Sequence, residues 1–259
     1  MTTPAITVTD LHKGFGGRPV LDGISFTVTQ GETVAVLGRS GTGKSVLLKT
    51  IIALLDPDAG KVEVFGCDLH ALAERGRLKA RSDLGYLFQG SALFDSLSVC
   101  ENVGFPLYQR RQPEAEIRAR VVEALDAVGL AHAIDQVPSE LSGGMQKRVG
   151  LARAIIDKPR IILYDEPTTG LDPMTTDVID RIILDLQERH GITSVMVTHD
   201  IRSAFAVADR IIMLEQGRIV AMGTPDEVSA SDNAWVQRFL GIRREPSSHS
   251  SISLRAFKP

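Results

Sequence analysis

The sequence predicts an α/β protein with a mostly parallel core sheet, an N-terminal antiparallel β subdomain and an inserted helical subdomain. Near the N-terminus, apolar and polar residues alternate over 6–9 and 24–29, as in strands with one exposed face. Three other segments are almost continuously apolar, as in strands buried on both faces of a parallel sheet, namely 33–37, 160–165 and 192–197. Between two of these buried strands, residues 90–157 have a helical texture, which predicts an inserted lobe.

The first third of the chain is expected to alternate strands and turns around one helix. Glycine, proline and polar residues predict turns at 14–19 and 30–32. A glycine-rich loop follows the buried strand 33–37, and a helix is expected over 44–55. Residues 56–60 end this helix, and the return of alternation over 61–66 predicts another antiparallel strand.

The remaining elements rest on apolar spacing and on helix-start signals. They are a short strand over 84–88, helices over 113–128 and 173–189, a hairpin of strands 210–214 and 218–222, and a helix that begins with a capping box at 224–227. The sequence after Gly241 is rich in arginine, serine and proline, so we expect a flexible tail over 242–259.

Composition narrows the class of protein. The chain has 259 residues, 43% hydrophobic and 24% charged, and a net charge of −3, so no basic surface indicates nucleic acid. Two isolated cysteines, Cys67 and Cys100, predict neither a disulfide framework nor a metal site. No apolar stretch approaches the ~20 residues of a membrane span, and the N-terminus does not have the pattern of a signal peptide. We therefore expect a soluble cytoplasmic chain whose membrane role, if any, needs partners.

A phosphate-binding loop is predicted at the start of the first helix. The loop follows a buried strand, and its glycines allow backbone N–H groups to turn toward phosphates at a helix N-terminus. The pattern consists of Gly38, Arg39, Ser40, Gly41, Thr42, Gly43, Lys44 and Ser45. Lys44 is expected to reach the β- and γ-phosphates, and Ser45 to bind Mg²⁺. The alternative is an ordinary glycine-rich turn between a strand and a helix.

Two adjacent acids, Asp165 and Glu166, follow the second buried strand. Successive strand side chains point to opposite sides, so the two carboxylates are expected to have different roles. Asp165 is predicted to hold Mg²⁺, usually through water, and Glu166 to polarise the attacking water. The alternative is a pair of acids that solvates the end of a strand.

A second glycine-rich helix start lies at Ser142, Gly143 and Gly144. Each glycine costs about 1 kcal/mol inside a helix, but at the N-terminus it exposes N–H groups, and Ser142 can cap the helix. Lys44 already holds the single γ-phosphate of one ATP. We therefore predict that this second anion site grips the ATP of another copy of the chain; a plain N-cap is the alternative.

Residues 141–148 followed by 151–154 resemble the signature helix of ABC-transporter ATPases, a class of P-loop NTPase. The order of motifs also matches, and the resemblance covers about residues 5–225. It implies a domain over 5–241, with its core at 5–89 and 159–225 and a helical subdomain at about 90–158. It further implies a homodimer that hydrolyses two ATP with Mg²⁺ at its interface.

The resemblance assigns roles that chemistry alone leaves open. Phe15 resembles the aromatic that stacks on adenine, with a core aromatic as the alternative. Gln89 resembles the glutamine that touches Mg²⁺ and senses the membrane partner, and Asp172 resembles a loop residue that crosses between subunits. His199 resembles the histidine that contacts the γ-phosphate. Val46 joins the phosphate loop as a nucleotide contact, and Met145 departs from the glutamine that many members carry.

The stretch 88–107 is similar to ATPases of Mla-type and Mce-associated lipid transporters. This resemblance implies an integral-membrane permease docked near residues 89–102, Mce-type substrate-binding and accessory subunits, and a peripheral position on the cytoplasmic face of the inner membrane. The expected cargo is phospholipid or a related lipid. The alternatives are an ATPase that drives import of a small polar solute and a non-transport regulator of the same type.

Overall fold

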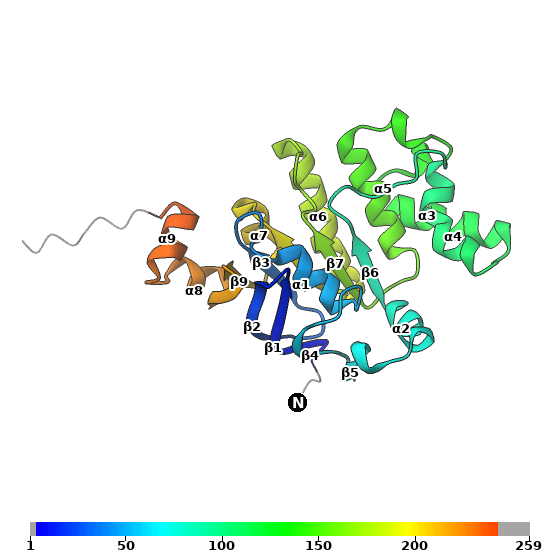
Figure 1. Cartoon of the computed structure of the whole chain (residues 1–259). Coiled ribbons are helices and arrows are strands. Elements are labelled where there is room, and N and C mark those ends of the chain that lie inside the picture. The colour runs from blue at the N-terminus through cyan, green and yellow to red at the C-terminus, as the bar shows by residue number, and fades with distance from the viewer. Residues whose placement is uncertain (1–3, 243–259) are drawn as a thin grey trace, which may run out of the picture.

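The computed structural model describes residues 4–242, so the tail expected over 242–259 lies, apart from its first residue, outside the described residues. Two sheets form the frame, one of four strands in the order β2-β1-β4-β5 and one of six strands in the order β10-β9-β3-β8-β7-β6. Figure 1 shows the six-stranded core flanked by the small sheet and by a separate lobe of helices. The predicted fold class is confirmed.

The small sheet is antiparallel, and a long two-stranded ribbon dominates it. Its strands are β1 (Ile6–Phe15), β2 (Arg18–Val28), β4 (Ala59–Val64) and β5 (Cys67–Asp68). The turn expected over 14–19 is much shorter than predicted, because β1 and β2 continue to Phe15 and from Arg18. Only Gly16 and Gly17 connect them, with φ of 56° and 78°, values that glycine adopts without a Cβ penalty.

The large sheet is parallel except at its β9–β10 edge, where the predicted hairpin forms. Its strands are β3 (Thr33–Leu37), β6 (Leu84–Leu87), β7 (Ile161–Asp165), β8 (Thr193–Thr198), β9 (Arg210–Glu215) and β10 (Arg218–Gly223). Because the first five run the same way, their carboxyl ends meet at one edge of the sheet. Ligand sites of open α/β sheets lie at that edge.

Two apolar clusters cover the two faces of this sheet. Alternate residues of β3 divide between them: Val34 and Val36 pack with the antiparallel sheet and α1 (Lys44–Ile51), while Ala35 and Leu37 pack with the helices of the other side. Every residue of β3 is buried, as is every residue of β7. Burial on both faces explains why these strands are continuously apolar in the sequence.

The lobe consists of α3 (Val99–Gln109), α4 (Glu114–Ala127) and α5 (Gly143–Ile155), and it stands to one side of the core (Figure 1). Residues 90–98, expected to be helical in texture, form turns and loop instead. The buried side chain of Asn102 explains this, because it accepts from Phe94 N and donates to the carbonyl oxygens of Phe94 and Leu97. Such side chain–backbone bonds compete with helix formation.

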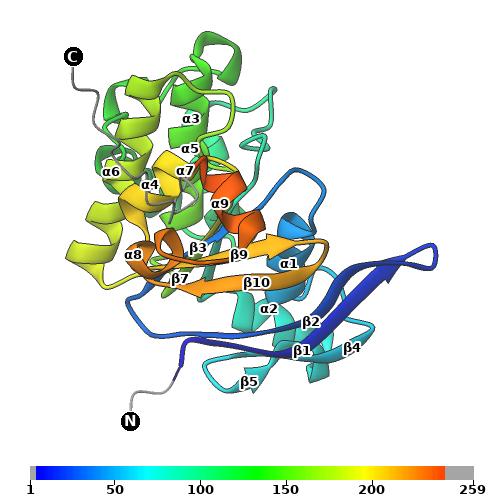
Figure 2. The ribbon, with the colours of Figure 1, turned by 90° about the vertical axis from the view of Figure 1, so that its left-hand side faces the viewer.

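The other helices are α2 (Glu74–Arg81), α6 (Pro173–His190), α7 (Ile201–Val207), α8 (Pro225–Ser229) and α9 (Ala234–Leu240). Figure 2 shows α8 and α9 beside the β9–β10 edge. The helix predicted over 44–55 is too long, because α1 ends at Ile51 and Ala53 adopts a left-handed φ of 53°. Across residues 4–242, the structure contains no helix that is both long and apolar enough to cross a membrane.

Candidate active site

The predicted phosphate loop connects β3 to α1 at the carboxyl edge of the large sheet. Two of its glycines are required by their surroundings. A Cβ on Gly38 would lie 2.5 Å from the carbonyl oxygen of Leu214. Gly43 has φ of 99°, and a Cβ there would lie 2.7 Å from the carbonyl oxygen of Val20. The loop therefore fits between β9 and β2 only when these positions carry no side chain.

Lys44 begins α1 and is 5% exposed. Its Nζ donates to the carbonyl oxygens of Gly38, at 2.8 Å, and Arg39, at 3.0 Å. The same Nζ lies 3.2 Å from Oε1 of Glu166, whose side chain is also buried. The fold thus holds a lysine cation inside the loop and pairs it with the carboxylate that the sequence predicts to be catalytic.

Asp165 and Ser45 face each other across the ends of β7 and α1. Ser45 Oγ donates to Asp165 Oδ1 at 2.7 Å, and the Tyr86 hydroxyl donates to Oδ2 at 3.1 Å. Burial, together with the nearby Asp165, raises the pKa of Tyr86, so this hydroxyl keeps its proton at neutral pH. Two hydroxyl groups from different elements thereby fix the orientation of one carboxylate.

Glu166 leaves β7 with a left-handed φ of 52°, a backbone conformation that only surrounding structure can enforce in a residue with a side chain. Its Oε2 accepts from Thr169 Oγ1 at 2.9 Å and lies 2.8 Å from His199 Nδ1. Burial would raise the pKa of Glu166, but the Thr169 hydrogen bond and the charges of Lys44 and His199 outweigh it and lower that pKa. Glu166 is therefore a carboxylate at neutral pH.

Five predicted residues thus gather at one edge of the sheet in two bonded groups, Ser45 with Asp165 and Glu166 with Lys44 and His199. Asp165 and Glu166 are adjacent in the chain and bring the two groups together, and we call the five residues the network. They come from three different segments that share the carboxyl edge of the sheet. Within residues 4–242, the side chains of Gln89 and Phe15 make no hydrogen bond or ion pair with these five residues. Gln89 is exposed, and Phe15, at the end of β1, is 48% exposed with Lys13 Nζ 5.4 Å above its ring.

The second predicted anion site is not joined to the phosphate loop of its own chain by any such contact in the described part of the molecule. Ser142 caps α5 and accepts from the backbone N of Met145 at 3.3 Å. A Cβ added to Gly143 would meet no atom within 4 Å, whereas one on Gly144 would lie 2.3 Å from Thr175 Cγ2. The start of α5 is thus packed against α6 on one side and open on the other.

Asp172 caps α6 and is tied to the same threonine. Its carboxylate accepts from Thr175 N at 3.0 Å and from Thr175 Oγ1 at 2.7 Å, and these hydrogen bonds lower the pKa of Asp172. The structure therefore gives Asp172 a role within its own chain. It also brings the two predicted intersubunit segments into contact with each other through Gly144 and Thr175.

Sequence reasoning missed several residues of this site. Tyr86 lies one residue before the end of β6, which pairs in parallel with β7, and its place at the carboxyl edge of the sheet is the one signal that could have found it. Lys147 of α5 is 7% exposed and donates to the carbonyl oxygens of Gln89 and Glu166. No local pattern indicates that contact, because α5 and β6 are remote in the chain.

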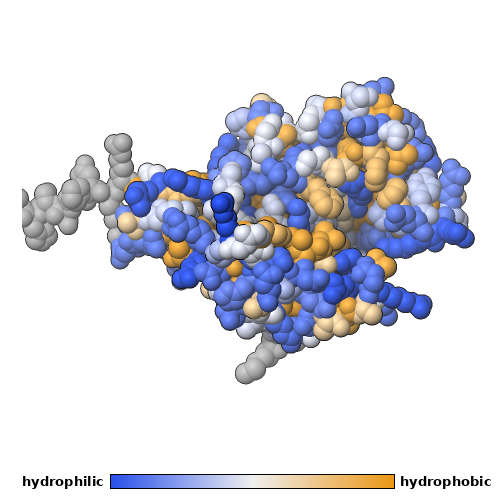
Figure 3. Space-filling model, viewed as in Figure 1, coloured by the Kyte–Doolittle hydropathy of each residue, from blue (hydrophilic) through white to orange (hydrophobic). Residues whose placement is uncertain are grey.

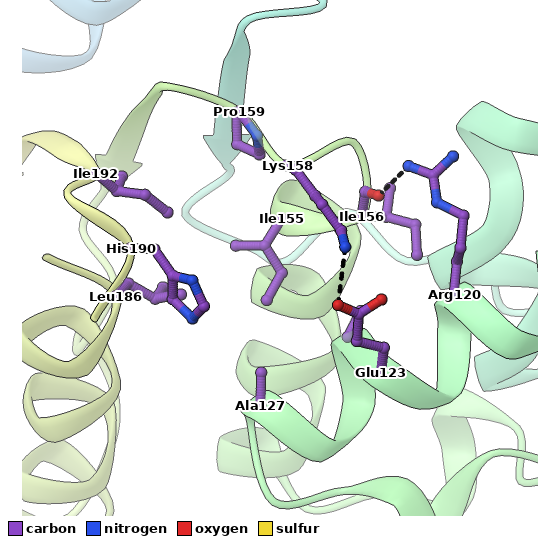
Figure 4. Close-up of a pocket in the computed structure, with 11 residues that line it drawn as sticks. Arg120, Glu123, Ala127, Ile155, Ile156, Lys158, Pro159, Leu186, His190 and Ile192 are labelled. Atoms are coloured by element: carbon purple, nitrogen blue, oxygen red, sulfur yellow. Dashed lines mark hydrogen bonds and ion pairs between the residues drawn. The ribbon is translucent and has the colours of Figure 1, made fainter.

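Two cavities of the molecule are lined by residues outside the network. One cavity of about 300 Å³ lies between α4, the end of α5 and the end of α6, and Figure 4 shows Ile155 between Leu186 and the Lys158–Glu123 ion pair. A second cavity of about 240 Å³ is lined by Arg39 of the phosphate loop and by Trp235, Arg238 and Phe239 of α9. The first of these belongs to the boundary between lobe and core rather than to the phosphate loop.

Comparison with known proteins decides the family. The sequence model described as "ABC transporter" matches residues 21–169, a range that holds the phosphate loop, the start of α5 and the two acids at the end of β7. The chain belongs to the ABC transporter family. It is an ATP-binding subunit of that family and hydrolyses ATP, as ABC ATPase domains do.

Three curated relatives cover almost the whole ABC domain. "Probable ribonucleotide transport ATP-binding protein mkl" of Mycobacterium tuberculosis is 40% identical over 241 residues, covering 93% of this chain and 67% of its own length. The methionine import ATP-binding protein MetN of Caulobacter vibrioides is 42% identical, covering 91% and 72%. Protein TRIGALACTOSYLDIACYLGLYCEROL 3, chloroplastic, of Arabidopsis thaliana is 40% identical, covering 89% and 71%.

A solved structure shares this ABC fold. The dimeric post-hydrolysis state of the ATP-binding cassette MJ0796, bound to ADP and Pi, has a TM-score of 0.78 and 33% sequence identity. It covers 85% of this chain and 98% of the solved one. The predicted ATPase class is confirmed.

Proposed function

We propose that two copies of this chain bind two ATP molecules between them and that hydrolysis drives a membrane permease which moves phospholipid or a related lipid. The observation that carries the catalytic part is the network of Lys44, Ser45, Asp165, Glu166 and His199. Its members have the charges that phosphoryl transfer needs: a cation for the phosphates, oxygens for a metal ion and a carboxylate base.

Phosphate binding is assigned to Lys44 together with the backbone N–H groups of residues 38–46. The α1 N-terminus adds partial positive charge at the same point. Lys44 is already oriented by the carbonyl oxygens of the loop, so little side-chain freedom remains to be lost on binding. Incoming phosphate oxygens compete with Glu166 for this ammonium, which frees the carboxylate for its own task.

A magnesium ion fits the oxygens of Ser45 and Asp165, because Mg²⁺ prefers hydroxyl, carboxylate and phosphate oxygens. Within residues 4–242, no group of three or more His, Cys, Asp or Glu could hold a metal ion. When bound, the ion neutralises charge on the β- and γ-phosphates. Gln89 follows β6 beside Asp165, and its predicted role as a third ligand stays a proposal.

Glu166 is proposed to accept a proton from the water that attacks the γ-phosphate. Its lowered pKa keeps it ionised, and the hydrogen bond from Thr169 fixes its orientation. His199, half exposed and 2.8 Å from Glu166, is proposed to contact the γ-phosphate and to hold the base in place. The products are ADP and phosphate.

The dimer is supported by the position of α5. Its N-terminus has an anion-binding character, yet it makes no contact with the phosphate loop of its own chain within the described range. The open side of Gly143 leaves room for a ligand that the same chain does not provide. The dimeric cassette MJ0796 with ADP and Pi supports the same arrangement. Ser142 and Asp172 then belong to the site of the partner subunit.

The permease is proposed to dock beside residues 89–102. Phe88 and Phe94 are 37% and 43% exposed, and the ring of Phe94 lies 4.7 Å from that of Phe105. Figure 3 shows apolar side chains gathered over the lobe and its junction with the core. Such exposed apolar groups suit a short helix of a membrane protein, and this docking would hold the chain on the cytoplasmic face of the inner membrane.

Lipid cargo is supported by the resemblance of 88–107 to Mla-type and Mce-associated ATPases and by a relative whose name is that of a galactolipid. Mce-type substrate-binding subunits would then complete the complex. Import of a small polar solute is the second candidate, and the 42% identity to the methionine import protein MetN favours it. The ATP site is the same in both cases.

Purification of the chain with its native membrane complex separates these candidates. Lipid analysis by mass spectrometry should find phospholipid enriched in the complex, and phospholipid vesicles should stimulate ATP hydrolysis. Stimulation by methionine or another polar solute with its binding protein, and none by lipid, would replace the lipid proposal with the importer. Absence of any co-purified permease would contradict both.

A further inference from the structure

Segment 89–92 follows β6 and is held in a conformation that its own sequence does not favour. Ser91 and Ala92 have φ of 59° and 47°, in the left-handed region that residues with side chains rarely adopt. Ser91 is nonetheless only 3% exposed. Contacts from another element must therefore impose this backbone.

That element is α5, which contacts the segment through three residues that we call the α5 clasp: Lys147, Gly150 and Arg153. Arg153 Nη1 donates to the carbonyl oxygen of Ala92 at 2.8 Å and Nη2 to that of Ser91 at 2.5 Å. Lys147 Nζ donates to the carbonyl oxygen of Gln89. Two cations of one helix thus bind the carbonyl groups of three of the four residues.

Gly150 lets α5 approach this closely. A Cβ at this position would lie 3.0 Å from Leu87 Cδ1 and 3.3 Å from Ser91 Cβ, both tighter than ordinary contacts. Helix and segment therefore form one packed unit, and a shift of α5 displaces residues 89–92 with it.

Lys147 also reaches the hydrolytic side of the site. Its Nζ lies 3.3 Å from the carbonyl oxygen of Glu166. Burial lowers the pKa of Lys147, and the charges of Asp165 and Glu166 oppose that shift. The ammonium is 7% exposed and bonds to the main chain of both Gln89 and Glu166. A buried lysine in this position spans the two residues that the proposed mechanism places on either side of the γ-phosphate.

We propose that Lys147 is a positioning residue that ties the start of α5 at Ser142 to Gln89 and Glu166 of the same subunit. Five residues of helix, about 8 Å, separate Ser142 from Lys147. In the dimer, Ser142 serves the ATP of one site and Glu166 the ATP of the other. ATP binding at one site therefore fixes the position of Glu166, the proposed base, at the other site. The inference rests on the dimer of the proposed function.

The first test is steady-state hydrolysis by Lys147→Met and Gly150→Ala. Lys147→Met removes the positive charge. Gly150→Ala keeps that charge but pushes α5 away from residues 89–92. Both should lower kcat about tenfold and change the KM for ATP by less than about twofold, because neither touches phosphate. Lys147→Arg should restore at least a third of the parent kcat. Arg120→Met is the matched control, since it removes a cation–carbonyl bond to Ile156 at the other end of α5.

The inference is overturned if Lys147→Met keeps more than half of the parent kcat. The inference is equally overturned if Lys147→Met lowers both kcat and the affinity for ATP, or if Lys147→Arg has the same low kcat as Lys147→Met. In either case the lysine would only support the fold.

A second measurement follows the coupling between α5 and segment 89–92 directly. In a Glu166→Gln background, ATP should slow hydrogen exchange in the peptide that contains residues 84–98, and Lys147→Met should abolish that response. If the ATP-bound dimer forms and the response persists without Lys147, only this inference fails. If no dimer forms with ATP, the proposed function itself fails.

Discussion

Replacement of Gly144 by alanine should destabilise the chain through a single atom. The new Cβ would lie 2.3 Å from Thr175 Cγ2, so α5 and α6 must separate by about 1 Å to restore ordinary contact. Forcing a methyl group into a packed interior costs about 1–3 kcal/mol. The better helix propensity of alanine offsets at most about 1 kcal/mol of this, so we expect a net loss of about 1–2 kcal/mol.

The chain provides both a control and a rescue. Gly143→Ala places a Cβ where no atom lies within 4 Å, so it should be neutral or slightly stabilising. Thr175→Ser removes Cγ2, and the remaining Thr175 atoms would be 3.6 Å and 3.7 Å from the new Cβ. Serine also keeps the hydroxyl that donates to Asp172. The double variant Gly144→Ala/Thr175→Ser should therefore recover most of the lost stability.

The assay is urea unfolding followed by circular dichroism, with the free energies of the four proteins combined in a double-mutant cycle. We expect a coupling energy of about 1–2 kcal/mol between positions 144 and 175. Equal stability of Gly144→Ala and Gly143→Ala would refute the contact between α5 and α6. A double variant no more stable than Gly144→Ala would refute the assignment of the clash to Cγ2.

Four further predictions concern the catalytic network and the docking surface. Lys44→Ala should abolish phosphate release because the phosphates lose their cation; near-parent turnover would contradict the phosphate assignment. Glu166→Gln should lower kcat about 10²–10⁴-fold while ATP affinity stays or improves, since Lys44 is released from its ion pair; weaker ATP binding by equilibrium dialysis would count against that pairing. The pKa of Glu166 lies below its ordinary value of 4.5, so its carboxylate stabilises the fold above that pH and this contribution is lost as the pH falls through the lower folded value; urea unfolding of Glu166→Gln at several pH values should lack that part of the acid dependence. Asp at Leu93 or Phe94 should detach the permease in a pull-down and leave basal ATP hydrolysis intact, and a complex that survives both changes would refute the docking surface.

The sequence predicted that the proposed catalytic residues lie close together, because each of their motifs follows a buried strand. Lys44, Glu166 and His199 come after β3, β7 and β8, and parallel strands bring such residues to one edge of a sheet. No knowledge of side-chain contacts was needed for this. The residues that orient the network, Tyr86 and Lys147, were missed because their partners are decided by packing between distant elements.

The errors in the fold have equally local causes. α2 was missed because none of its residues is buried, so it carries no apolar stripe to find. α7 and α9 are each seven residues long, too short for periodicity, although Asp200 and Asn233 cap them. The loop 90–98 was read as helical because the bonds that Asn102 makes to its backbone are not visible in a pattern.

The mass of the Glu166→Gln protein with ATP tests the central claim most directly. Sedimentation velocity without nucleotide gives the reference, and saturating ATP should convert the chain to a species of twice the mass with one ATP per chain. A chain that binds ATP stoichiometrically and keeps the mass of a single copy would contradict the shared site.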